Sequence, residues 1–141
     1  MQSALETYLP RLLVLILSLS FLACSHSLAQ EDISPSAEAL IGRWDVDLYY
    51  SPSAPPSKTE LVITEAKDGK LAGTFYQSSF LNSGYTMFED AVLFTVSTAD
   101  NSGPYFTSGR LEGECIEGQT LSTGREFLMA WKACPAKDGA Q

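Results

Sequence analysis

Two carboxylate pairs are the side chains in this 141-residue sequence whose spacing could support catalysis. Asp45 with Asp47, and Glu112 with Glu114, are two residues apart, which in a strand places both carboxylates of a pair on one face. A glycosidase needs two carboxylates that face one another across a cleft, about 5 to 10 Å apart. Neighbours on one strand form no cleft, so we interpret both pairs as solvated outer faces and predict no catalytic residues.

Histidine and cysteine chemistry is also restricted. The only histidine, His26, lies in an N-terminal segment that we expect to be removed. Without it the chain has no Ser-His-Asp or Cys-His arrangement and no histidine-based metal site. Cys115 and Cys134 have no metal-ligand partner at suitable spacing. We therefore expect a protein that is not an enzyme and that has no metal and no cofactor.

The N-terminus has the layout of an export signal. Residues 12–23 form an apolar run behind Arg11, and residues 27–29 offer a small-x-small cleavage site before Gln30. This predicts a signal peptide over 1–29 and a secreted or periplasmic protein. Two alternatives remain: an uncleaved anchor, and a lipoprotein attached through Cys24, because residues 21–24 resemble a lipobox.

The remainder has the size of one domain and a strongly acidic balance. The net charge of the chain is −8, with the acidic residues scattered, which disfavours nucleic acid as a partner. No membrane span is expected after signal cleavage. Two cysteines in an exported chain usually pair, so we predict a Cys115–Cys134 disulfide worth about 3 kcal/mol.

Alternating patterns predict strands. In residues 43–50 the side chains of Trp44, Val46, Leu48 and Tyr50 share one face. A proline-rich loop follows over 51–57, and then a hairpin of strands 60–65 and 71–76 that turns at Asp68-Gly69. A short helical turn is expected near 36–40.

Further strands follow after an expected turn at 82–84. Residues 91–96 are apolar on both faces, so this strand could be covered twice, including by a second copy of the chain. A loop is expected at 100–104, and a last pair of strands at 105–117 and 126–133, joined near 122–124. On this pattern Cys115 points inward and Cys134 has the opposite parity; a bulge, or a position beyond the strand end, would reconcile them. The whole indicates an all-β antiparallel barrel or sandwich.

Two motifs resemble the calycin superfamily of lipocalins and avidins. Gly42-Arg43-Trp44 is similar to its Gly-x-Trp, and residues 68–75 are similar to an avidin hairpin. The resemblance implies a single antiparallel up-and-down barrel of six to eight strands over 40–135, with Trp44 closing one end. A flexible lead-in at 30–39 and a disordered tail at 136–141 would flank it. The proline-rich loop lacks the polar biotin-binding loop of avidins, so biotin binding is not implied.

Six aromatic residues could line a ligand pocket or form a packed core: Trp44, Tyr50, Phe75, Phe94, Phe127 and Trp131. We expect an exported non-enzymatic protein that binds a small apolar ligand or an exported protein partner. One alternative is a secreted or periplasmic protease inhibitor whose 30–39 lead-in enters the protease. Another is a structural envelope protein.

Overall fold

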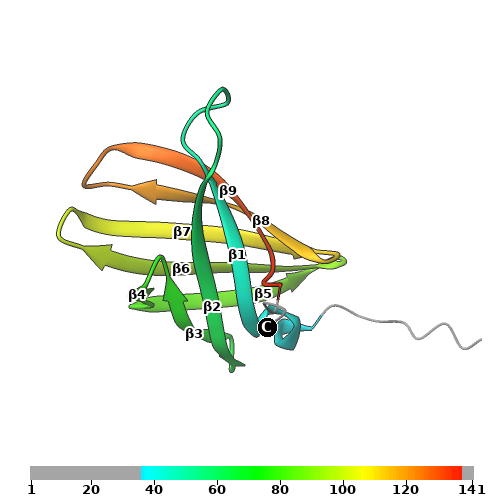
Figure 1. Cartoon of the computed structure of the whole chain (residues 1–141). Coiled ribbons are helices and arrows are strands. Elements are labelled where there is room, and N and C mark those ends of the chain that lie inside the picture. Colours follow the sequence, from blue (N-terminus) through cyan, green and yellow to red (C-terminus); the bar gives the residue numbers. More distant parts are fainter. Residues whose placement is uncertain (1–35, 138–141) are drawn as a thin grey trace, which may run out of the picture. The chain divides into compact units, whose positions relative to one another are not determined.

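The structure, a computed structural model, describes residues 36–137 as one all-β unit (Figure 1). The 3-10 helix η1 (Ala37–Leu40) is followed by the strands β1 (Gly42–Tyr49), β2 (Ser57–Lys67), β3 (Lys70–Phe75), β4 (Ser78–Ser79), β5 (Asn82–Phe88), β6 (Ala91–Asp100), β7 (Gly103–Glu112), β8 (Cys115–Ser122) and β9 (Phe127–Pro135). The expected signal peptide, Cys24, residues 30–35 of the lead-in and residues 138–141 of the tail lie outside the described residues. The described residues include no helix with the length and apolar character that a membrane crossing requires.

All the described strands belong to one antiparallel sheet, in the order β4-β3-β2-β1-β9-β8-β7-β6-β5. The prediction of an all-β antiparallel fold is thus confirmed. The expected six to eight strands were too few, because the sheet has nine, and its strand pairing does not close into a ring. In Figure 1 β1 and β2 run steeply across the direction of β6 and β7, since the sheet curls back over itself.

A seam between β3 and the β4–β5 segment brings the two edges of the curled sheet into contact. The Phe80 N–H donates to the Gly73 carbonyl (3.0 Å), and the Tyr85 N–H donates to the Gly69 carbonyl (3.1 Å). Between these bonds, the Ser83 hydroxyl accepts from the Leu71 N–H and donates to the Leu71 carbonyl, both at 2.8 Å. A serine side chain therefore replaces one step of the backbone ladder.

The inward-facing side chains change character along the strands. One cross-strand row is aliphatic and joins Val92, Leu111, Ile116, Ala133 and Val46 through the register of β6, β7, β8, β9 and β1. The second inward row from it, toward the end of β6, consists of Val96, Thr107, Thr120 and Met129 on β6, β7, β8 and β9. Thr107 and Thr120 are fully buried, and their hydroxyls bond to each other at 2.9 Å. Small, mutually satisfied polar side chains thus occupy positions where larger apolar ones would fill the interior.

Between these rows, two facing glycines make room for aromatic rings. Gly109 of β7 pairs with Gly118 of β8. A Cβ at Gly109 would lie 2.6 Å from the Phe94 ring, and one at Gly118 would lie 2.1 Å from the Trp131 ring. The rings of Phe94 and Trp131 therefore lie directly on the backbone of the two strands, with their centroids 6.5 Å apart.

The end of the sheet where β1 begins is closed by η1. Leu40 is fully buried there, and the Trp44 indole N–H donates to the Leu40 carbonyl at 2.9 Å. The predicted helical turn near 36–40 is confirmed by η1, whose N-terminus is capped by the Ser36 side chain.

The Asp68-Gly69 hairpin is confirmed, with positive φ angles of 50° and 74° at the two turn residues. The expected turn at 82–84 is wrong, because these residues begin β5, where Ser83 forms the seam. The expected loop at 100–104 is reduced to a tight connection between β6 and β7, which pair up to Asp100 and Gly103.

The expected strand at 105–117 is wrong, because it is two strands joined by a hairpin at Gly113, whose φ is +70°. The turn reverses the inward-outward parity, so Cys115 lies on the outer face and not inward. Ile116 of β8 pairs with Ala133 of β9, and Cys115 and Cys134 each lie one residue beyond this pair in the same direction. The two cysteines therefore face each other across β8 and β9. The structure contains the predicted Cys115–Cys134 disulfide, and it needs no bulge.

Charged side chains of alternating sign cross the outer face. Lys58, Asp47, Lys132, Glu117 and Arg110 stand opposite one another from β2 through β1, β9 and β8 to β7. Lys58 pairs with Asp47, and Lys132 pairs with Glu117 at 3.1 Å. Of the carboxylates predicted to be solvated, Asp47 is half-buried in this row and Asp45 is exposed. Glu112 and Glu114 are also exposed, but the expectation that they share one strand is wrong, because β7 ends at Glu112 and Glu114 lies in the turn.

Candidate functional site

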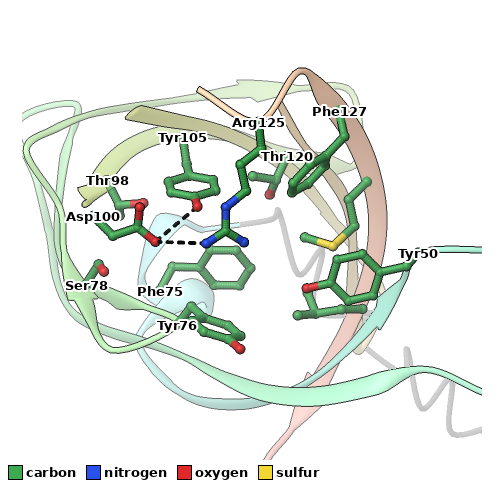
Figure 2. Close-up of a pocket in the computed structure, with 12 residues that line it drawn as sticks. Tyr50, Phe75, Tyr76, Ser78, Thr98, Asp100, Tyr105, Thr120, Arg125 and Phe127 are labelled. Carbon is green, nitrogen blue, oxygen red and sulfur yellow. Dashed lines mark hydrogen bonds and ion pairs between the residues drawn. The ribbon is translucent and has the colours of Figure 1, made fainter. Parts of the chain in front are cut away.

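A pocket of about 140 Å³ opens at the end of the sheet opposite η1 (Figure 2). It lies where β1, β3, β6 and β8 end and where β7 and β9 begin. Thr120 and Met129 of the threonine row described above line it, and Thr120 leaves space that a leucine would occupy. The pocket therefore follows from side-chain size at a few inward positions.

One wall of the pocket is apolar and aromatic. It consists of Leu48, Tyr50, Phe75, Tyr76, Phe127 and Met129. The rings of Tyr50 and Phe127 meet edge to face at the mouth, with centroids 6.3 Å apart. Phe75 is buried and contacts Trp131 behind it, at a centroid distance of 5.5 Å. Tyr50 and Tyr76 are each 60% exposed, which places them at the rim.

The other side chains that line the pocket are polar or charged: Ser78, Thr98, Asp100, Tyr105, Thr120 and Arg125. Asp100 is held by several donors. One carboxylate oxygen accepts from the Ser102 N–H (2.7 Å) and the Ser102 hydroxyl (2.5 Å), and the other accepts from the Tyr105 hydroxyl (3.0 Å). Arg125 lies 4.0 Å from that second oxygen and points toward the aromatic wall (Figure 2).

Arg125 is positioned by the turn between β8 and β9. Its N–H donates to the hydroxyl of Ser122 at 3.2 Å, and its Nε donates to the hydroxyl of Ser102 at 3.0 Å. This turn packs tightly against the β6–β7 turn, since a Cβ at Gly124 would lie 1.7 Å from the Ser102 carbonyl oxygen. Only glycine allows that approach, and the approach brings Arg125 beside Asp100.

The hydrogen bonds of this network change the acidity of the groups in it. The Ser102 hydroxyl and N–H, with smaller contributions from Tyr105 and Arg125, hold the pKa of Asp100 below its usual value. Partial burial, together with the neighbouring Tyr76, raises the pKa of Tyr50, while Arg125 opposes that rise. At neutral pH the lowered pKa keeps the Asp100 carboxyl ionised, and the raised pKa keeps the Tyr50 phenol neutral.

Of the six aromatic residues that the sequence suggested as pocket residues, the structure places three in the pocket: Tyr50, Phe75 and Phe127. Phe94 and Trp131 are buried against the glycine pair, behind the wall. Trp44 is buried at the opposite end of the sheet, under η1. The indole N–H of Trp131 has no hydrogen-bond partner within residues 36–137.

Sequence reasoning missed the polar half of the pocket. Asp100 was assigned to a loop, and Thr98 and Thr120 gave no signal because threonine is common on both faces of strands. The alternation of residues 116, 118, 120 and 122 could have placed Thr120 on an inner face, once the turn at Gly113 was recognised.

Metal binding has no candidate in this part of the chain, because within residues 36–137 no three histidine, cysteine, aspartate or glutamate side chains come together. The chain matches no family model, and a search of the curated proteins finds no significant match.

Proposed function

We propose that this protein binds a small molecule in the pocket between β1, β3, β6 and β9 and that it is not an enzyme. The observation that carries the proposal is the pocket itself, which combines aromatic side chains with a few oriented polar groups, the usual composition of a ligand site. Its volume of about 140 Å³ is similar to that of cavities of about 150 Å³ that hold one benzene ring.

We also propose that the curled sheet acts as a calycin-like barrel. The seam supports this, because Ser83 and the flanking backbone bonds join β3 to β5 where the strand pairing itself is open. The position of Trp44 beneath η1 also supports it, because the Gly-x-Trp resemblance implies a tryptophan that closes one end. A barrel closed at one end and open at the other would hold one small ligand.

We also propose that the protein is exported. The Cys115–Cys134 disulfide supports an oxidising compartment, and the apolar N-terminal run remains the reason to expect a signal peptide. The protease-inhibitor alternative depends on the 30–39 lead-in, most of which lies outside the described residues.

Tryptophan emission tests the proposal directly. The chain has two tryptophans, and Trp131 contacts the pocket wall through Phe75, whereas Trp44 lies at the other end. In a Trp44→Phe background, single-ring compounds should change Trp131 emission saturably. Fatty acids, retinoids, haem and biotin, tested beside them, should bind more weakly because the pocket is small.

A matched pair of variants on β4 locates the binding. Ser78 lines the pocket, and its neighbour Ser79 is exposed. Ser78→Phe should abolish the saturable response by filling the pocket, and Ser79→Phe should leave it unchanged. No response from any compound, or equal effects of the two variants, would contradict the proposed function.

A further inference from the structure

At the pocket mouth, the Arg125 guanidinium has hydrogen-bond donors left over that only an acceptor can use. Both oxygens of Asp100, the only carboxylate among the described residues that line the pocket, already accept hydrogen bonds. Arg125 donates through Nε and approaches Asp100 with one Nη, so within the described residues its other Nη has no protein partner. The hydroxyls of Tyr50, Tyr76 and Ser78 likewise bond to no other described side chain or backbone group.

A ligand that enters this mouth gains most by presenting an acceptor. A cationic head would have to share Asp100 with Ser102 and Tyr105, which already donate to its two oxygens. It would also approach the guanidinium of Arg125, which is an unfavourable like-charge contact. An anionic head can accept from Arg125 in a charge-assisted hydrogen bond and from the rim hydroxyls at the same time.

Size limits the rest of the ligand. A pocket of about 140 Å³ has room for one ring against Phe75, Met129 and Leu48, and Figure 2 shows the Arg125 guanidinium facing that space from the mouth. We infer that the ligand is a single-ring aromatic carboxylate, with its ring on the aromatic wall and its carboxylate on Arg125. This inference rests on the proposed function and specifies the ligand of the same pocket.

Three probes of nearly equal size and different charge test it: benzoate, benzyl alcohol and benzylamine. Titrations of the purified protein, followed by Trp131 emission and by nuclear magnetic resonance shifts, should rank benzoate first by about tenfold over benzyl alcohol, with benzylamine weakest. Arg125→Gln should remove the preference for benzoate and change benzyl alcohol binding less than about twofold. Arg110→Gln, which removes a charge from the outer face, should preserve the preference.

The outcomes of these titrations distinguish a failure of the carboxylate inference from a failure of the proposed function. Equal binding of benzoate and benzyl alcohol, or a preference that survives Arg125→Gln, overturns the carboxylate inference while the pocket remains a ligand site. Tighter binding of benzylamine overturns it in favour of a cation. If none of the three probes binds and larger compounds also fail, the proposed function itself is overturned.

Discussion

The two ends of the curled sheet are formed by the same strands but by different inward side chains. At the η1 end the interior is apolar, and the indole N–H of Trp44 is satisfied locally by the Leu40 carbonyl. At the pocket end threonine, serine and tyrosine side chains lie beside the apolar ones, and no helix within residues 36–137 covers them. The η1 end is thus packed for stability, and on the proposed function the other end is left unfilled because it must admit a ligand.

The largest expected effect is a loss of stability at the closed end. Trp44→Ala removes a buried indole and leaves a cavity, so it should lower the free energy of unfolding by about 3 to 5 kcal/mol. Tyr50→Ala, on the same face of the first strand but at the exposed rim, should cost about 1 kcal/mol through loss of its contact with Phe127. Guanidinium denaturation measures both, and equal losses would contradict the division between the ends.

A smaller effect is expected at the boundary between the ends. Gly118→Ala would place a methyl group 2.1 Å from the Trp131 ring, and the resulting overpacking should cost about 1 to 3 kcal/mol. Gly84→Ala is the matched control, because its Cβ would meet nothing closer than the Gly69 carbonyl oxygen at 3.9 Å, and should change stability by less than about 0.5 kcal/mol. Thermal unfolding compares the two, and a tolerated alanine at 118 would mean that the rings are not packed on the backbone.

The smallest effect is a pH dependence at the mouth. The pKa of Asp100 is lower in the folded than in the unfolded chain, so the unfolded chain takes up the proton first as the pH falls. The stability that Asp100 contributes is therefore present above its ordinary pKa and is lost as the pH falls through the lowered value. Asp100→Asn should flatten the acid side of a plot of melting temperature against pH, slightly, because the carboxylate is 45% exposed. An unchanged profile would contradict the assignment.

Sequence patterns predicted the parts of the fold that are locally determined. The Asp68-Gly69 turn and the alternation of the first strand were recognisable because each depends on neighbouring residues. The Gly113 turn was missed because it interrupts an alternating pattern without proline or asparagine. Residues 82–84 have turn composition, and yet they form a strand because Ser83 bonds to Leu71, twelve residues earlier.

The pocket was predictable only in part. Aromatic side chains stand out in a sequence, so Tyr50, Phe75 and Phe127 were selected, but so were the core residues Trp44, Phe94 and Trp131. Whether a ring packs or lines a pocket depends on small residues on other strands, such as Gly118 and Thr120. The Asp100–Arg125 contact requires two turns to meet at Gly124, which no local pattern encodes.

β1 and β9, the first and last strands in chain order, are neighbours in the sheet, and this determines how the domain responds to force. β1 and β9 are antiparallel, with Trp44 opposite Pro135, and the Ala136 N–H donates to the Arg43 carbonyl at 2.9 Å. Tension applied at Gly42 and Ala136 therefore enters the ladder at one end and peels its hydrogen bonds in succession, beginning with the Ala136–Arg43 bond. Hydrogen bonds that are loaded one after another resist a far smaller force than bonds that are sheared all together, so β1 and β9 should separate first under tension. The disulfide between β8 and β9 keeps those two strands joined.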